Sequence, residues 1–405
     1  MANAELKDAN NLWRRETPGH PGWKRTARPG DVDKYFMLSA DAHVNEPTDL
    51  WHTRIDKKYR DRLPRYEERP DGLVQVTEGF RPLSIRPVPL DGEDLERGKA
   101  GRDPEDRLRD QARDGIDAEI MFANKGLQMW ATMDGEFANA MCRCWNDWAW
   151  DTFGPYNDRM SPIACIATAD LEGAIKEIKR VAKLGFRGIN LPCKPVFGPG
   201  DADHENYNLP TFDPMWEVIQ DADLPICFHI GTGKDPRGAR GHGGAIINYV
   251  VHALTPSVEP IANLCCSGVL ERFPKLAFGT VEAGIGWVSW ALFAMDEAHK
   301  KHHMWARPKL KKLPSEYFKE QGFATFQEDP AGLDLAREHG LIDNFMWAND
   351  YPHHEGTWPH SAAAIERTMG KLSEEERAKI LGLNAARIFK FDVPVKGVST
   401  LKKAD

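Results

Sequence analysis

Four separate segments of this 405-residue chain end a hydrophobic run with side chains that can bind a metal ion. They are Asp41-Ala42-His43, His229, Glu282 and Asp350. Alternate residues of a β-strand point to the same face, so Asp41 and His43 can contact one ion together. Carboxylate oxygen combined with imidazole nitrogen suits Zn, Fe or Mn. The four segments therefore predict a metal site, provided that the fold gathers them at one place.

Eight short apolar runs alternate with longer helical patterns, and this order decides where the candidate ligands lie. Near-continuous apolar runs are typical of strands buried on both faces of a parallel sheet. The expected strands are Tyr35–Ala40, Ala118–Ala123, Pro162–Thr168, Arg187–Leu191, Pro225–Ile230, Lys275–Val281, Gly322–Phe326 and Asn344–Ala348. The expected helices are Gly135–Thr152, Asp170–Leu184, Asp213–Ala222, Gly244–Arg272, Gly284–Ala306, Asp329–His339, Pro359–Met369 and Ser373–Phe389. This alternation predicts an α/β protein with a (β/α)8 TIM barrel, whose rim gathers the C-terminal ends of the strands.

The barrel is expected to carry additions at three places. Residues 1–34 should form an N-terminal arm on the surface or on a partner subunit, residues 35–390 the barrel, and residues 391–405 a C-terminal tail. The segment 51–104, between the first two strands, is far longer than an ordinary connection between a strand and a helix. It is expected to be an insertion that serves as a lid, a dimer contact or both, with a small hairpin around Gly72–Thr77.

The composition excludes several classes of protein. Acidic and basic residues are mixed along the chain and the net charge is −8, which argues against a nucleic-acid-binding face. No apolar stretch approaches the roughly 20 residues that span a bilayer, and the polar N-terminus has no signal-peptide pattern. Seven cysteines without a CxxC pair indicate buried thiols in a reducing compartment, so the cytoplasm is the expected location.

Several stretches carry a resemblance to a known family. They are Ser39–Pro47 with Asp49–Trp51, Leu184–Gly188, Pro225–Gly231, Glu282–Trp287, Asp350–His353 and Asn384–Arg387. In this order they resemble the amidohydrolase superfamily, in the branch of "amidohydrolase 2" metal-dependent hydrolases similar to aminocarboxymuconate-semialdehyde decarboxylase. The resemblance covers about residues 35–390. It implies a distorted (β/α)8 barrel with a divalent metal at the C-terminal rim, and it suggests dimers.

The resemblance also assigns roles to individual residues. Asp41 and His43 fill the metal-binding pair of the first strand, His229 matches the fifth-strand histidine, and Asp350 matches the eighth-strand aspartate. There is one departure, because the related decarboxylases carry a catalytic histidine on the sixth strand where this chain has Glu282. That departure argues against decarboxylation, unless the nearby His252 takes over the role.

The candidate ligands exceed the number that one ion needs. Glu46 follows the first strand and is predicted to be a further metal ligand. Glu46, Glu282 or Asp350 could bridge two ions about 3.5–4 Å apart, so the site is expected to hold one ion of Zn, Fe or Mn or a pair of ions. Substrate contacts are expected from Arg237 and Arg240, which can clamp a carboxylate.

Trp287 and His353 complete the predicted substrate-binding residues, Trp287 as an apolar wall of the pocket. The leading hypothesis is a hydrolase in which a metal-activated water attacks a small, carboxylate-bearing molecule. Asp350 would be both a ligand and a proton shuttle, with His252 and Glu282 in catalytic roles. Three alternatives are non-oxidative decarboxylation of an unsaturated or aromatic acid, oxygen activation at a dinuclear Fe or Mn centre, and a non-catalytic subunit. The expected assembly is a homodimer or a hetero-oligomer with a paralogue.

Overall fold

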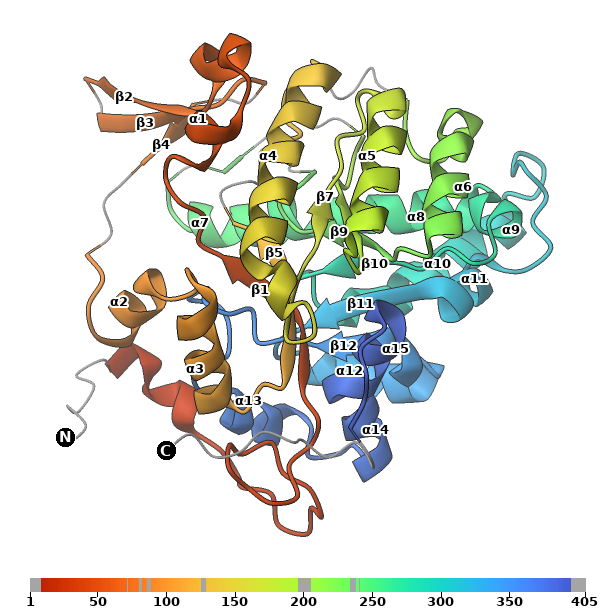
Figure 1. Ribbon diagram of the computed structural model, residues 1–405. Coiled ribbons are helices and arrows are strands. Elements are labelled where there is room, and N and C mark those ends of the chain that lie inside the picture. Colours follow the sequence, from red (N-terminus) through yellow and green to blue (C-terminus); the bar gives the residue numbers. More distant parts are fainter. Residues whose placement is uncertain are drawn as a thin grey trace.

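A ring of parallel strands forms the centre of the computed structural model, and helices surround it (Figure 1). The structure describes residues 9–70, 72–79, 82–85, 89–124, 129–195, 205–233, 238–239 and 241–394. One parallel sheet has the order β1 (Leu38–Val44), β5 (Ala118–Ala123), β6 (Met160–Pro162). The other has the order β12 (Phe345–Trp347), β11 (Gly322–Phe326), β10 (Phe278–Val281), β9 (Ile226–His229), β8 (Ile189–Leu191), β7 (Ala164–Cys165).

The two sheets join into a barrel at two seams. At the first seam, β6 and β7 are successive parts of one chain segment with only Ile163 between them. At the second seam, the His43 N–H donates to the carbonyl of Tyr351 at 2.6 Å, and the Asp350 N–H donates to the carbonyl of Asp41 at 3.1 Å. The predicted distorted (β/α)8 barrel is therefore confirmed, with β6 and β7 together forming its third strand.

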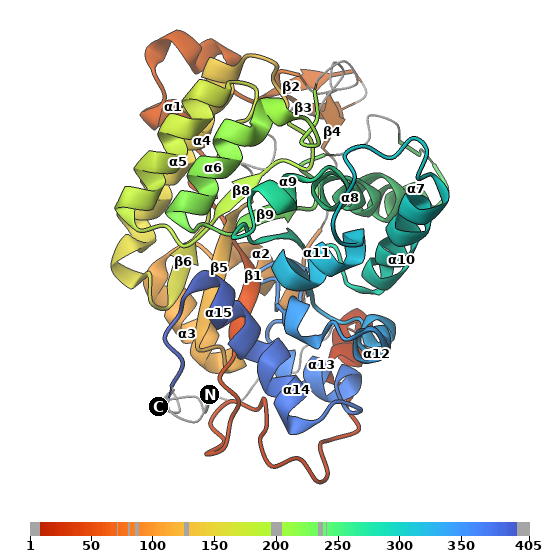
Figure 2. The ribbon, with the colours of Figure 1, turned by 90° about the vertical axis from the view of Figure 1, so that its right-hand side faces the viewer.

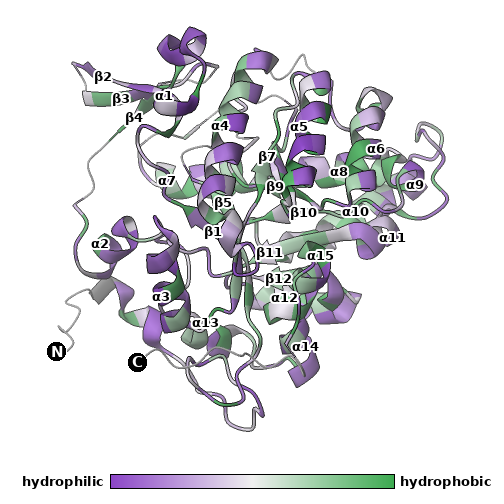
Figure 3. Ribbon diagram, in the orientation of Figure 1, coloured by the Kyte–Doolittle hydropathy of each residue, from purple (hydrophilic) through white to green (hydrophobic). Residues whose placement is uncertain are grey.

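The helices pack their apolar faces on the strands. They are α4 (Gly135–Phe153), α5 (Leu171–Leu184), α6 (Asp213–Ala222), α8 (Val258–Cys266), α10 (Gly286–Lys301), α11 (Pro314–Gln321), α12 (Pro330–His339), α13 (Ser361–Thr368), α14 (Glu374–Ala378) and α15 (Asn384–Phe389). Their outward faces are largely hydrophilic while the strands are hydrophobic (Figure 3), and the same surround of helices is seen from the side (Figure 2). Helix α5 shows the local signals clearly, since the Asp170 side chain caps its first turn and Gly185 ends it with φ of 106°.

Two of the predicted elements that differ from the structure bear on the site. The first strand, predicted as Tyr35–Ala40, is shifted to Leu38–Val44 and includes Asp41, Ala42 and His43, because pairing with β5 resumes at Ala42 after an irregularity in the register. The predicted helix Gly244–Arg272 is instead α7 (Gly244–Ile247), a π-helical turn η7 (Asn248–Leu254), a 3-10 turn η8 (Thr255–Ser257), α8 and α9 (Val269–Arg272). Pro256 lacks the N–H that a regular helix needs, and Gly268 breaks the path with φ of 80°.

The insertion after β1 has two parts. The first contains α1 (Leu50–Arg54), a 3-10 turn η2 (Lys57–Arg62) and a small antiparallel sheet of β2 (Arg65–Arg69), β3 (Gly72–Val76) and β4 (Leu83–Ser84). Its β2–β3 pair confirms the predicted hairpin. The second part contains α2 (Gly92–Lys99) and α3 (Pro104–Asp114) and lies below the small sheet in Figure 1, near the N-terminal arm.

The N-terminal arm lies on the barrel of its own chain. It begins with the 3-10 helix η1 (Ala9–Arg15), which contacts α13. Arg28 forms paired hydrogen bonds of 2.8 and 3.0 Å with the Glu366 carboxylate, and Lys34 forms a buried ion pair of 2.8 Å with Asp117. Within the described residues, no helix combines the length and the apolar character that crossing a bilayer requires.

Candidate metal centre

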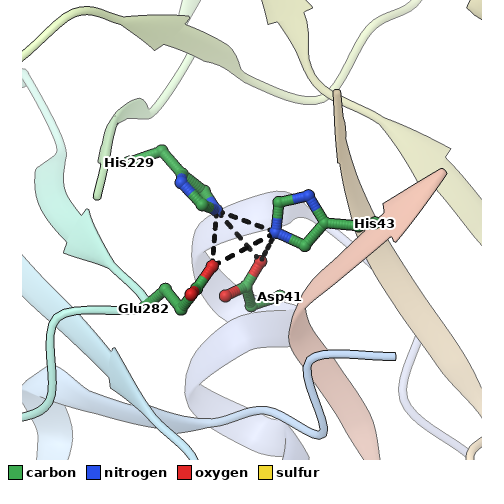
Figure 4. A group of neighbouring side chains, drawn as sticks. All are labelled: Asp41, His43, His229 and Glu282. Atoms are coloured by element: carbon green, nitrogen blue, oxygen red, sulfur yellow. Dashed lines mark hydrogen bonds and ion pairs between the residues drawn. The ribbon is translucent and has the colours of Figure 1, made fainter. Parts of the chain in front are cut away.

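Four buried side chains converge at the rim of the barrel from three strand ends (Figure 4). Asp41 and His43 come from β1, His229 is the last residue of β9, and Glu282 directly follows β10. The Glu282 Oε2 atom lies 3.3 Å from the Nε2 atoms of both histidines. The Asp41 Oδ1 atom lies 3.6 Å from Nε2 of His43 and 3.5 Å from Nε2 of His229. These are the separations expected between ligands about 2.0–2.2 Å from a shared ion.

The two imidazoles present lone pairs to each other. The Nδ1 atom of His43 lies 3.0 Å from the Ala123 carbonyl, and that of His229 lies 2.8 Å from the Ile230 carbonyl. A carbonyl can only accept, so each neutral ring carries its proton on Nδ1 and leaves Nε2 unprotonated. The two Nε2 atoms are 3.1 Å apart. Two lone pairs at this distance repel each other, and a cation between them removes the repulsion.

A second group overlaps the first. His43 and Glu282 belong to both groups, and Asp350 and His353 complete the second. The Asp350 Oδ1 atom lies 3.6 Å from Nε2 of His43 and 3.0 Å from Nδ1 of His353. The His353 ring stacks on the His43 ring with a centroid separation of 4.0 Å. The rim therefore offers six ligand-capable side chains in one continuous cluster.

The carboxylates in this cluster lack compensation from the protein. Asp41 is fully buried, and neither of its carboxylate oxygens accepts a hydrogen bond from any residue that the structure describes. Burial, together with Asp350 and Asp41, raises the pKa of Glu282 well above its ordinary value. Burial and Asp41 likewise raise the pKa of Asp350. Because a buried charge needs a partner, this donor set fits a divalent metal ion.

Two of the site residues have unusual backbone conformations. Glu282 has φ of 61° and Asp350 has φ of 51°, in the left-handed region that non-glycine residues seldom adopt. Each directly or closely follows a strand, where a left-handed residue turns the chain sharply and aims the carboxylate into the rim. Such a conformation costs roughly 1–3 kcal/mol per residue. Replacing either residue by glycine would relieve this strain but would also remove a carboxylate from the rim.

The remaining predicted site residues fall into three places. Glu46 lies outside both groups of the described residues, and its carboxylate accepts the Asn124 N–H at 2.9 Å. His252 lies half-buried on η7, also outside both groups. Trp287 lies at the start of α10, where its Nε1–H donates to the Ala283 carbonyl at 3.1 Å. Arg237 and Arg240 lie outside the described residues. The roles given to these five residues stay predictions.

Two further predicted site residues, Glu282 and His353, lie among the ligand-capable atoms. Glu282 was predicted to be catalytic or to bridge two ions and His353 to contact substrate, and these roles stay predictions. The signal for His353 was its position three residues after Asp350, which returns its ring to the same rim. That return depends on the fold of the connecting loop, which hydrophobic pattern does not reveal.

Comparisons with known proteins agree with the barrel fold. A family model described as Amidohydrolase matches residues 40–391. Gamma-resorcylate decarboxylase of Rhodococcus jostii (strain RHA1) is 26% identical over 251 residues, which are 58% of this chain and 72% of that protein. The same enzyme of Polaromonas sp. (strain JS666 / ATCC BAA-500) is 25% identical over 304 residues, covering 71% of this chain and 87% of that protein.

Solved structures share the fold at lower identity. An amidohydrolase from Mycobacterium avium subsp. paratuberculosis K-10 superposes with a TM-score of 0.71 and 21% identity, covering 88% of this chain and 99% of that one. A dihydroxybenzoic acid decarboxylase from Polaromonas sp. JS666, with bound manganese and the inhibitor 2-nitroresorcinol, superposes with a TM-score of 0.59 and 21% identity. That comparison covers 88% of this chain and 97% of the neighbour.

Proposed function

This chain belongs to the amidohydrolase family, and on that premise we propose that it releases carbon dioxide from a small aromatic acid. The support comes from the curated relatives, which are gamma-resorcylate decarboxylases, and from decarboxylases of aromatic acids among the structural neighbours. Non-oxidative decarboxylation, an alternative in the sequence analysis, therefore replaces hydrolysis as the leading hypothesis. The chain is an enzyme of this family, and the aromatic acid is the proposed part.

One observation carries the proposal: Asp41, His43, His229 and Glu282 face a common point, and Asp350 lies against that point. A divalent ion held there would supply the positive charge that binds the acidic oxygens of the substrate. The imidazoles of His43 and His229 and two or three carboxylates would provide the ligands. The burial of these groups excludes water from the reacting atoms, which strengthens every charge interaction in the site.

Asp350 is the residue we propose as proton donor. In the metal-free protein, burial and Asp41 raise its pKa, so its carboxyl group takes up a proton more readily than that of an exposed aspartate. In decarboxylation, the ring carbon that bears the carboxylate takes up a proton and the bond to the carboxylate carbon breaks. The electron pair of that bond remains with the ring as the new C–H bond forms, and carbon dioxide leaves. The Asp350 carboxyl at the rim is placed to deliver this proton.

Glu282 favours one second candidate, which is hydrolysis. By the resemblance, it stands where the related decarboxylases carry a histidine. Its carboxylate lies 3.3 Å from the imidazoles of both His43 and His229. A buried carboxyl group with a raised pKa can act as a general base toward a water molecule. In a decarboxylase, the same carboxylate would serve as one more metal ligand and would make the site more negative.

The test uses the full chain loaded with Mn²⁺ and two aromatic acids, gamma-resorcylate and 5-carboxyvanillate, alongside a phenyl ester and an anilide of matched size. Carbon dioxide release, substrate loss and oxygen uptake are measured together. We expect one carbon dioxide per aromatic acid consumed, no oxygen uptake, and loss of turnover after chelation. Asp350→Asn should abolish turnover while leaving the fold intact. Ester or anilide cleavage without carbon dioxide release would overturn the proposal in favour of hydrolysis, and oxygen uptake would favour the oxygenase alternative.

A further inference from the structure

The loop at residues 350–356, which carries Asp350 and His353, folds back tightly on the end of β12. The His353 N–H donates to the Asp350 carbonyl at 2.9 Å, and the Gly356 N–H donates to the His353 carbonyl at 3.2 Å. A Cβ atom added at Gly356 would lie 2.7 Å from the Asp350 carbonyl oxygen and closer still to that of Asn349. The loop therefore requires glycine at this position, and its carbonyls at His353, His354 and Gly356 accept side-chain hydrogen bonds from elsewhere in the chain.

Arg14, from η1 of the N-terminal arm, binds two of these carbonyls. Its Nη1 atom donates to the Gly356 carbonyl at 2.5 Å, and its Nη2 atom donates to the His354 carbonyl. Its Nε atom donates to the Asn11 side chain at 2.9 Å, which fixes the plane of the guanidinium group. Arg14 is 8% exposed, so water competes little for these bonds. The arm therefore contacts the loop through a guanidinium group that donates to the loop on one side and to Asn11 of the arm on the other.

Arg97, from α2 of the insertion, binds the same loop from a second direction. Its Nη1 atom donates to the carbonyls of His353 and Gly356, each at 3.2 Å. Its Nη2 atom donates to Glu93 at 2.7 Å, and the other oxygen of Glu93 lies 2.8 Å from Nε2 of His360. Arg97 is 1% exposed. A buried ion pair with further hydrogen bonds fixes geometry more than it adds stability.

The two guanidinium groups share the Gly356 carbonyl although their charges repel. Burial and the nearby Arg97 lower the pKa of Arg14, while Glu93 opposes this effect. Bringing two buried cations together is unfavourable unless carboxylates and carbonyls surround them, as they do here. Ordinary stabilisation of a surface loop does not call for such an arrangement. It is consistent with a loop whose position has to be set accurately.

We propose that Arg14 and Arg97 are positioning residues for the metal centre, which they set by fixing the 350–356 loop from outside the barrel. Through this loop they hold the His353 ring on His43 and its Nδ1 atom 3.0 Å from Asp350. Arg14 lies ahead of residue 40, where the family match begins, so the arm gives this chain a means of completing its rim that the matched region does not contain. The proposal rests on the proposed function only in placing a metal ion at this rim.

The experiment compares Arg14→Ala with Arg28→Ala in the full-length protein. Arg28 fastens the same arm through its paired bonds to Glu366 and does not contact the loop, so it is the matched control for arm docking. Mn²⁺ affinity is measured by titration of chelator-treated protein, and the visible spectrum of the Co²⁺ form reports ligand geometry. Mutation of a residue that orients a metal ligand typically lowers metal affinity by about 10–100-fold. We expect a loss of that size and a changed Co²⁺ spectrum for Arg14→Ala, with both readouts unchanged for Arg28→Ala.

Arg14→Lys is the conservative variant, and it also serves if Arg14→Ala does not fold. Lysine keeps the charge but cannot bind two carbonyls in one plane, so part of the loss should remain. If Arg14→Ala, or Arg14→Lys in its place, melts earlier while metal affinity and the Co²⁺ spectrum stay as in the parent protein, the role is purely structural and the proposal is overturned. Neither readout involves a substrate. A failure of decarboxylation and a failure of positioning are therefore distinguishable.

Discussion

The metal centre has two halves that the fold positions in different ways. His229 ends β9, whose backbone pairs with β8 and β10. Asp41 and His43 lie within β1, which pairs with β5 on one side and forms backbone hydrogen bonds with the 350–356 loop on the other. Asp350 and His353 instead lie on a loop that side-chain hydrogen bonds from Arg14 and Arg97 hold in place. The strand-borne half is fixed by the strands and by Arg107 of α3, which donates to the His43 carbonyl at 2.7 Å, while the loop-borne half depends on the arm and on α2. Variants that damage one half and spare the other test this difference.

The largest effect is expected from Asp41→Asn in the strand-borne half. Asparagine removes the negative charge but keeps the size of the side chain. Mn²⁺ affinity should therefore fall by more than about a hundredfold, which exceeds the loss expected when a residue that only orients a metal ligand is mutated. Because Asp41 is buried without hydrogen bonds to its carboxylate from the described residues, the metal-free variant should melt no earlier than the parent protein. Titration with Mn²⁺ and thermal melting with and without the metal measure both quantities.

Asp114→Asn is the matched control for that variant. Asp114 is also buried, but its oxygens accept bonds of 3.0 and 2.6 Å from the N–H and hydroxyl of Ser361. Its replacement should lower the melting temperature with and without metal and leave the metal-induced shift in place. If Asp41→Asn behaved in the same way, Asp41 would be a structural residue rather than a ligand.

The second expected effect is on the pH dependence of metal stabilisation. Burial and neighbouring carboxylates raise the pKa of Glu282 and of Asp350 above their ordinary values of 4.5 and 3.8. A raised folded-state pKa stabilises the metal-free protein below the ordinary pKa, and this contribution is lost as pH rises through the raised pKa. Metal binding requires the ionised carboxylates, so the stabilisation by Mn²⁺ should grow over the same rise in pH.

His43 has the opposite sign in the metal-free protein. Burial and the neighbouring His353 and His229 lower its pKa well below 6.5, so its contribution is present above pH 6.5 and is lost as pH falls. Melting temperatures from pH 5 to 9, with chelator or with Mn²⁺ at one fixed concentration, a hundred times its Kd at pH 9, give the comparison. At pH 9 this concentration stabilises by about 2.7 kcal/mol. A metal-induced shift that shrank as pH rose would contradict carboxylate ligation.

The sequence was informative about the strand-borne half for a physical reason. Apolar runs report burial, and a parallel barrel brings the ends of all such runs to one rim, so Asp41, His229 and Asp350 could be placed together without any contact being known. The limits of β1 were wrong because a buried carboxylate was read as the end of the strand. The strand continues past Asp41, because pairing with β5 is interrupted there and resumes at Ala42.

The loop-borne half could not be predicted in the same way. The left-handed φ of Glu282 and Asp350 leaves no periodic signal, and neither residue is a glycine or asparagine that would suggest it. Arg14 and Arg97 stand in polar segments, where a charged side chain reads as a solvated surface. Their burial follows from how the arm and α2 fold onto the 350–356 loop, and this is a property of the whole chain rather than of a motif.

A third prediction concerns the glycine on which the loop depends. Gly356→Ala places a Cβ atom 2.7 Å from the Asp350 carbonyl oxygen, so the loop must move. We expect a loss of stability of about 1–3 kcal/mol from overpacking, together with weaker Mn²⁺ binding. Gly370→Ala is the control, because its Cβ would meet only the Glu366 carbonyl at 3.9 Å. Denaturant unfolding and metal titration separate the two effects, and unchanged metal binding in Gly356→Ala would mean that the loop position does not affect the site.

The smallest effect is expected from Glu46→Gln, and it tests a ligand that the sequence indicated. The Glu46 carboxylate accepts the Asn124 N–H at 2.9 Å and lies outside both ligand-capable groups of the described residues. A glutamine oxygen can accept the same bond, so Mn²⁺ affinity should change by less than about threefold, the equivalent of roughly 0.7 kcal/mol. Asp41→Asn makes the same change of charge within β1 and should lower Mn²⁺ affinity far more. A loss for Glu46→Gln as large as that for Asp41→Asn would extend the strand-borne half beyond β1 and would restore Glu46 as a ligand.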